Sequence, residues 1–349
     1  MKILYAVQAT GNGHISRAIE LLPFLEQYGN VDVFLSGNNS NLNTALPIKY
    51  RSKGMSLFYG NKGGLDYWKM MKDFSLQRIW KEANALPVEQ YDIVLNDFDS
   101  ITSLACFLKK KPSVGFGHQA SFQSKNTPRA VKKDLAGEWI LNHYAIATAY
   151  AGLHFKPYDQ FIFSPVIKQT ILQANPKSEA YITVYLSHYN DDIVKKALQK
   201  IGGMRFEVFS KKIQQPVTEG NITFIPISNE GFTQSMINSA GVITGAGFET
   251  PAEALYLGKK LLCLPIRGQY EQHCNAAALK EFGVTVVDKI DDQFATFVDA
   301  WLQAPAPMNL TLGQSTYEIV QQVIELARSL QHKHLADQYL TEDDLMVMF

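Results

Sequence analysis

The sequence contains little cysteine and no apolar run long enough to cross a membrane. Its 349 residues include only three cysteines, Cys106, Cys263 and Cys274, and none of them lies in a CxxC motif or at a metal-ligand spacing. We interpret all three as reduced core residues of a cytoplasmic protein. No stretch approaches the roughly 18 apolar residues of a membrane-spanning helix, and the N-terminus lacks the longer apolar region of a signal peptide. The sequence therefore predicts a cytoplasmic protein, at most peripheral to the inner face of a membrane.

An excess of charge of either sign is also absent. Lysine plus arginine and aspartate plus glutamate each number 33, so the formal net charge is zero and nothing favours nucleic acid as a partner. The eight histidines do not pair with acids at helical ligand spacing, except His332 and His334 in a C-terminal helix, which we interpret as solvated, and we predict no metal site. Asp97-Phe98-Asp99 has the form of a metal-binding motif, but we interpret it as coincidence. A hydrophobic fraction of 46% with 19% charged residues is typical of a globular protein with extensive cores.

Short apolar strands alternate with helical stretches through both halves of the chain, which predicts two parallel α/β domains. The first half offers strands at Ile3–Gln8, Val31–Leu35, Ser56–Tyr59, Ile93–Asn96, Ser113–Gly117 and Leu153–Phe155. The second half offers Tyr181–Leu186, Phe206–Phe209, Ile222–Ile225, Val242–Thr244 and Leu261–Leu264. A segment of weak periodicity between two prolines suggests a first domain over 1–163 and a second over 164–310. A helical segment over 311–349 would follow, with its regular pattern from about Ser315 to Lys333.

The run from Gly241 to Ala276 is the most informative part of the chain. A short strand leads into a loop with Gly245 and Gly247, and a helix then opens with Glu249 and Thr250 ahead of a proline. Backbone N–H groups at such a junction point at whatever lies above the helix end, and the helix dipole favours phosphate there. Glu253 follows one turn later, within reach of ribose hydroxyls. The next strand and its loop bring further polar residues, Glu271, Gln272 and Asn275, to the same edge. The pattern indicates a site for a nucleoside diphosphate that has a polar group attached.

A second glycine loop, Gly11-Asn12-Gly13-His14, follows the first strand. It is not a dinucleotide fingerprint, since Ser16 occupies the third glycine position. His14 is interpreted either as a surface histidine at a helix start or as a general base.

Two aspartates follow the strand that should neighbour the first, and either would be able to orient the imidazole of His14. We favour a helix cap for Asp99, whereas Asp97 stays open between a cap and a catalytic role. His118, after the next strand, is either another candidate base or a loop histidine bonded to the backbone.

Two weaker signals lie elsewhere. Ser187 follows the first strand of the second half, as a phosphate contact or a helix cap. The stretch from Lys49 to Glu82 mixes basic and aromatic residues, which suits an anionic membrane surface but equally suits a surface helix with a buried aromatic face.

The string GFETPAEALYLGKKLLCLP, from Gly247 to Pro265, resembles the donor-binding signature of GT-B nucleotide-sugar glycosyltransferases. Thr250, Glu253, Gly258, Pro265 and the Glu271-Gln272 pair occupy the positions of that signature. Among GT-B enzymes the chain is most similar to bacterial lipid-intermediate GlcNAc transferases of cell-wall synthesis and their uncharacterised relatives. It departs from plant-type members in a longer spacing from proline to acid and in having Glu271 where they have aspartate.

The resemblance implies two Rossmann-like domains that face a cleft, with a C-terminal helix that crosses back to the first domain. The first domain would bind the acceptor and the second the donor. His14 would be the general base, with Asp97 as its partner. The residues implied in donor binding are Gly13, Ser187, Ile225 (through the main chain, at the nucleobase), Gly245, Gly247, Phe248, Glu249, Thr250, Glu253, Glu271 and Gln272.

The implied activity is that of a metal-independent inverting glycosyltransferase. It would use a UDP-sugar as substrate, need no cofactor, and transfer the sugar to a hydroxyl acceptor such as a lipid-linked or envelope glycan. Two alternatives stay open. One is a UDP-GlcNAc 2-epimerase, although the Arg-Pro-Glu motif usual in its first loop has no match in Gly11–Arg17. The other is a non-catalytic nucleotide-sugar-binding protein.

Overall fold

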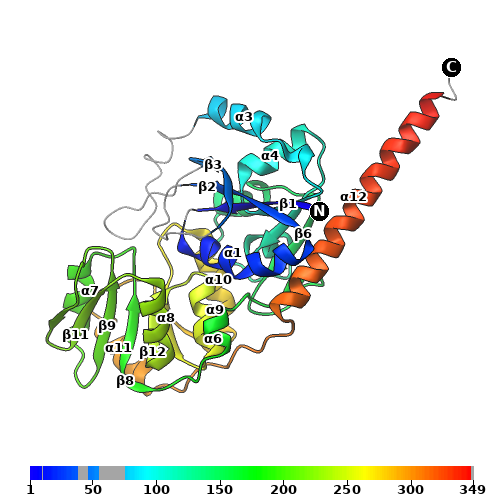
Figure 1. Ribbon diagram of the computed structural model, residues 1–349. Helices are drawn as coiled ribbons and strands as arrows, with labels where there is room; N and C mark the ends of the chain where they lie inside the picture. The colour runs from blue at the N-terminus through cyan, green and yellow to red at the C-terminus, as the bar shows by residue number, and fades with distance from the viewer. Residues whose placement is uncertain (10, 38–45, 55–74, 347–349) are drawn as a thin grey trace.

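The chain forms two parallel-sheet domains, one above the other in Figure 1, in a computed structural model. The structure describes residues 1–9, 11–37, 46–54 and 75–346, and side chains as far as 334. The first sheet has the order β3-β2-β1-β4-β5-β6-β7 and is parallel throughout. Its strands are β1 (Lys2–Gln8), β2 (Asn30–Ser36), β3 (Ile48–Ser52), β4 (Ile93–Asp97), β5 (Val114–Gly117), β6 (Ala149–Leu153) and β7 (Ile162–Phe163).

The second sheet has the order β10-β11-β9-β8-β12-β13-β14 and is parallel except for the edge strand β10. Its strands are β8 (Glu179–Tyr185), β9 (Arg205–Ser210), β10 (Val217–Glu219), β11 (Ile222–Pro226), β12 (Ser239–Gly245), β13 (Lys260–Leu264) and β14 (Thr285–Val286). The α-helices are α1 (Asn12–Leu25), α3 (Leu76–Ala85), α4 (Ser100–Leu108), α5 (Leu135–His143), α6 (Gln169–Leu172), α7 (Asp191–Leu198), α8 (Asn229–Asn238), α9 (Glu249–Tyr256), α10 (Tyr270–Lys280), α11 (Phe294–Gln303) and α12 (Thr316–Met346).

Strand β1 shows why the first domain is covered on both faces. Its side chains alternate between the two faces, as in any strand, and all of those from Ile3 to Val7 are buried. Ile3, Tyr5 and Val7 join one core with residues of α1 and α12. Leu4 and Ala6 join a separate core with residues of α3 and α4. A strand that is buried on both faces has a continuous apolar sequence, and this run allowed β1 to be predicted.

The predicted fold class is confirmed. The long helix α12 returns to the first domain, where it packs against α1, β4 and β5 (Figure 1). The chain passes from the first sheet to the second between β7 and β8, and the proposed domain boundaries stay predictions. Among the described residues, no helix is both long and apolar enough to span a membrane.

Some element predictions were wrong in detail. The strand expected at Leu153–Phe155 is β6, which begins at Ala149 and ends at Leu153. The expected strand Ser56–Tyr59 lies outside the described residues, and β3 precedes it at Ile48–Ser52 with an alternating rather than continuous apolar pattern. Strands β7, β10 and β14 have only two or three residues each, too few for a periodic signal.

Candidate active site

His14 and Asp97 meet at the carboxyl edge of the first sheet. β1 and β4 are parallel neighbours, with Val7 opposite Asp97. The glycine loop after β1 begins α1, and its first turn places His14 Nδ1 at 3.0 Å from Asp97 Oδ1. The structure therefore brings together the two residues that were the catalytic candidates, although they are 83 positions apart.

Arg17 holds Asp97 from the same helix turn as His14. Its Nη2 donates to both carboxylate oxygens at 2.8 Å, and its Nε donates to Oδ2 at 3.2 Å. The Arg17 residue is only 3% exposed. A Cβ at position 117 would collide with the Asp97 carboxylate, so Gly117 leaves room for this pair.

The chain reverses directly after Asp97. Phe98 has φ +58°, a left-handed conformation that is uncommon for a bulky residue, and a strained backbone of this kind is often found at functional sites. The turn allows Asp97 to face His14 while Asp99 starts α4 by accepting a hydrogen bond from the backbone N–H of Thr102 at 2.6 Å. The predicted capping role of Asp99 is confirmed.

The charges around His14 favour the tautomer that has its lone pair on Nε2. Asp97 accepts from Nδ1–H, which leaves the lone pair on Nε2, 3.4 Å from Gln119 Nε2. Burial lowers the pKa of His14, but the charge of Asp97 and its hydrogen bond more than offset this, so the pKa of His14 is raised. Burial likewise raises the pKa of Asp97, yet Arg17 and His14 reverse the shift and lower that pKa. Asp97 is therefore a charged partner at neutral pH.

The start of α9 lies against this pair from the second domain. α9 follows Gly245 at the end of β12, as the sequence predicted, and contacts α1. No side chain caps its first turn. Arg17 Nη1 donates to Glu249 Oε1, which joins the two domains, and Thr250 is the next residue of the same turn.

Glu253 lies one turn into α9, as predicted, but its carboxylate is buried. It is 2% exposed and lies 3.3 Å from the ammonium of Lys168, which belongs to the segment between the two sheets. Burial raises the pKa of Glu253 to about 7 against the opposing charge of Lys168. A ribose would have to share or replace this ion pair.

Glu271 and Gln272, at the start of α10, have different surroundings. Glu271 Oε2 accepts from Gln119 Nε2 at 3.1 Å, and this amide also faces His14. Gln272 is buried, and its Oε1 accepts from the backbone N–H of Ile266 at 2.9 Å. Glu271 therefore faces the candidate base, whereas Gln272 holds the loop after β13.

His118 lies in the domain contact rather than free in a loop. Its Nδ1 is 2.9 Å from the carbonyl oxygen of Leu153, and its Nε2 is 2.8 Å from Asn275 Oδ1 in the second domain. Its ring stacks on Phe248 with centroids 4.0 Å apart. Burial lowers the pKa of His118. With both nitrogens so engaged, it is poorly placed to exchange a proton with a substrate.

The remaining predicted donor residues follow strand ends of the second sheet. Ser187 is exposed after β8, and Ile225 is half-buried near the end of β11. Asn190, not Ser187, caps α7 by accepting from the backbone N–H of Asp192. Gly245 and Gly247 flank the turn into α9. Parallel strands place these ends at one edge of the sheet.

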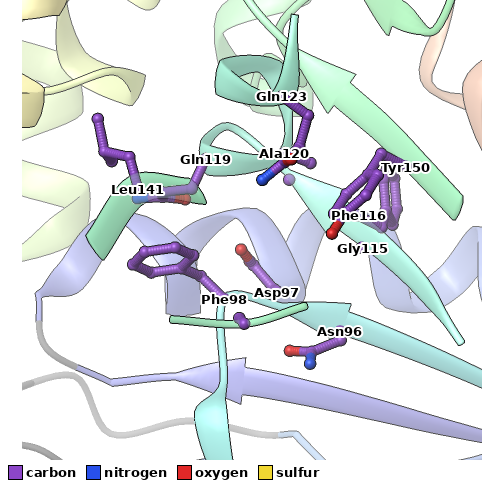
Figure 2. Close-up of a pocket in the computed structure, with 12 residues that line it drawn as sticks. Asn96, Asp97, Phe98, Gly115, Phe116, Gln119, Ala120, Gln123, Leu141 and Tyr150 are labelled. Carbon is purple, nitrogen blue, oxygen red and sulfur yellow. The ribbon is translucent and has the colours of Figure 1, made fainter. Parts of the chain in front are cut away.

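A small hollow adjoins Asp97 on the first domain. Its cavity volume is about 10 Å³, roughly the space of one water molecule. Figure 2 shows Asp97 and Phe98 on one side with Gln119 and Leu141 on the other. Tyr150 and Phe116 complete an aromatic wall. Among the described residues, no group of three or more histidine, cysteine, aspartate or glutamate side chains is arranged to hold a metal ion.

The sequence analysis missed Arg17, Gln119 and Lys168. A signal existed for Arg17, since it lies three residues after His14 on the face of α1 that also carries Ala18 and Leu21, both buried. A charged residue on such a face needs a buried partner. Gln119 begins a five-residue 3-10 helix and Lys168 directly precedes the short helix α6, and neither segment is long enough for a periodic pattern to mark an inward side chain.

His188 makes folding stability depend on pH in a measurable way. Burial lowers the pKa of His188 to about 4, and its Nε2 has no hydrogen-bond partner among the described residues. The unfolded chain takes up this proton near pH 6.5 whereas the folded chain does not, so stability is lost as the pH falls from about 6.5 to 4. Glu253 and His14, with raised pKa values, act in the opposite sense.

We therefore expect a difference between the wild type and His188→Gln. Below pH 6.5 the wild type should lose about 1.4 kcal/mol of unfolding free energy per pH unit relative to the variant. Urea unfolding of both proteins at pH 7.5, 6 and 5 measures this. If the unfolding free energies of the two proteins change in parallel with pH, the folded chain protonates His188 as readily as the unfolded chain does.

The two parallel-sheet domains and the C-terminal helix that returns to the first of them form a GT-B fold. A family model described as glycosyl transferase family 1 matches residues 1–304, so the chain belongs to this family and is a glycosyltransferase.

Solved structures agree on the fold. The chain is similar to UGT89C1 of Arabidopsis thaliana, solved in complex with UDP, with TM-score 0.57 and 14% identity over 93% of this chain and 98% of that one. The spinosyn forosaminyltransferase SpnP gives TM-score 0.55 and 14% identity over 94% and 99%. SnogD of Streptomyces nogalater gives 0.53 and 13% over 94% and 99%. No curated protein matches the chain.

Proposed function

We propose that the chain is an inverting, metal-independent glycosyltransferase that moves a sugar from a UDP-sugar to a hydroxyl acceptor. The observation that supports this most is the His14–Asp97 pair, 3.0 Å apart, set against the start of α9. The UDP in the UGT89C1 structure supports uracil as the base of the donor. The resemblance to lipid-intermediate transferases supports a lipid-linked or envelope acceptor.

The proposed reaction is a single displacement. The acceptor enters beside Asp97, and its hydroxyl oxygen attacks the anomeric carbon of the sugar while His14 Nε2 takes the hydroxyl proton. The bond from that carbon to the diphosphate oxygen breaks, and UDP leaves with the electron pair. Backbone N–H groups at the start of α9 stabilise the charge that develops on the diphosphate, so positive charge is available without a metal. Glu253 would bind the ribose, and main-chain groups near Ile225 would meet the base.

The proposal is tested in two stages. A thermal-shift screen with UDP, dTDP and GDP should show the largest stabilisation with UDP. UDP release from a panel of UDP-sugars, without and with cell extracts as a source of acceptor, should then depend on the extract. A change of sugar configuration without any acceptor would instead indicate the epimerase. Binding without either reaction in any extract would indicate a nucleotide-sugar-binding protein.

Glu271 should read the sugar rather than the nucleotide, because it faces Gln119 and the candidate base His14 rather than the phosphate end of α9. The isosteric change Glu271→Gln should weaken binding of the UDP-sugar that the enzyme uses by about tenfold, as expected for loss of a charged hydrogen bond, and leave UDP binding unchanged. Calorimetry with both ligands measures this. If the affinities for the UDP-sugar and for UDP fall equally, Glu271 contacts the nucleotide instead of the sugar.

A weak membrane contact also belongs to the proposal. Most of the basic and aromatic stretch 49–82 lies outside the described residues, but α3 exposes Leu76 and Trp80 beside Lys81. We expect salt-sensitive binding to anionic vesicles, because charge attraction is screened over about 8–10 Å near physiological salt. Sedimentation with phosphatidylserine vesicles at low and high salt measures it, with neutral vesicles as control. If no protein sediments at low salt, α3 is an ordinary surface helix.

A further inference from the structure

A carboxylate from the second domain lies over the glycine loop of the first. Glu249 is the first residue of α9, and its side chain reaches Arg17 of α1. The helices α1 and α9 contact each other where the two domains meet (Figure 1). A Cβ on Gly13 would collide with the Glu249 carboxylate, so this group rests directly on the backbone of the loop. An anion therefore already occupies the space between Gly13, Arg17 and the start of α9.

Arg17 is shared between two carboxylates. Its Nε and Nη2 are directed to Asp97, and its Nη1 is directed to Glu249. The two acceptors differ in how firmly they are held. The Asp97 side chain is fully buried, whereas the Glu249 side chain is 20% exposed and is able to turn toward solvent about its own bonds. The Nη1 side of Arg17 is thus the side that is able to change its partner.

We propose that Arg17 binds the diphosphate of the donor and that, before the donor binds, the Glu249 carboxylate occupies the same position at the guanidinium. The inference rests on the proposed function, which puts a diphosphate at the start of α9. A carboxylate and a phosphate both seek the same guanidinium and repel each other, so they compete for it. Arg17 keeps Asp97 through its other nitrogens during the exchange. Arg17 then contacts both Asp97, which orients the candidate base His14, and the diphosphate that leaves.

The competition predicts opposite effects for the two residues. Glu249→Gln removes the competing charge and should tighten UDP binding by roughly tenfold, while uridine, which has no phosphate, should bind as before. Arg17→Lys keeps a charge but lacks the forked geometry that serves two anions at once, and should weaken UDP binding by roughly tenfold, again without effect on uridine. If the two residues had only a structural role, the affinities for UDP and for uridine would change by the same factor.

Calorimetry with UDP, and competition of uridine against UDP, measure these effects on the full chain. Thermal unfolding of each variant checks that it folds. If Arg17→Lys does not fold, the result with Glu249→Gln alone decides the test. Weaker UDP binding by Glu249→Gln, or an unchanged ratio of UDP to uridine affinity, would overturn the inference. A wild type that binds no nucleoside diphosphate would instead overturn the proposed function.

Discussion

Replacing His14 with alanine should lower kcat by about a hundred- to ten-thousand-fold, the usual contribution of a general base. The imidazole is oriented by Asp97 through Nδ1, so Nε2, whose lone pair faces the Gln119 amide, is the group that would take the acceptor proton. UDP affinity should barely change, because the proposed contact of His14 is with the acceptor. Turnover with an extract-derived acceptor and calorimetry with UDP measure the two quantities.

A matched control separates this effect from general damage. His143 is an exposed histidine on α5 that hydrogen-bonds to the backbone of its own helix, and His143→Ala should keep full turnover. If His14→Ala retains near-normal kcat with a true acceptor, the base lies elsewhere and Asp97 is the next residue to test.

Asp97→Asn should damage both stability and turnover. It removes the fully buried one of the two carboxylates that the guanidinium of Arg17 contacts and leaves only Glu249, and breaking a buried pair in this way costs up to about 3–5 kcal/mol of unfolding free energy. Asp97 also raises the pKa of His14, so its loss should lower that pKa and move the acidic limb of the kcat/KM profile to lower pH. We expect kcat to fall by at least about a hundredfold.

Asp99→Asn is the control for this variant. Asp99 lies two residues away and caps α4, a role that asparagine also performs well, so stability and turnover should stay close to wild type. Urea unfolding and a pH–rate profile distinguish the two variants. If the pH–rate profiles of Asp97→Asn and the wild type are equal, Asp97 has a structural role only.

The sequence predicted best where the signal was local. The turn from β12 into α9 followed from glycines before a helix start with Glu249 and Thr250, and the cap of α4 followed from an aspartate after a strand. Continuous apolar runs located β1 and β4 because both faces of those strands are buried. Each of these features is decided by a few consecutive residues, so the chain displays it directly.

Prediction was weaker where partners are distant. Glu253 was placed correctly on α9, but its pairing with Lys168, 85 positions away, has no local pattern. His118 was a candidate base until the structure showed both ring nitrogens engaged across the domain contact. The environment of a polar side chain depends on which segments meet it, and spacing along the chain does not contain that information.

The sequence by itself determined two α/β domains, an anion-favouring helix start and a histidine after the first strand, because periodicity, glycine turns and helix signals are local properties. Only the tertiary structure decided what surrounds that histidine. Arg17 meets Asp97 across 80 positions and Glu249 across 232, and these contacts exist because two parallel sheets bring their carboxyl edges together. Burial of Arg17 and Asp97 then makes the pairing of these two obligatory, since an isolated charge in that interior would be too costly.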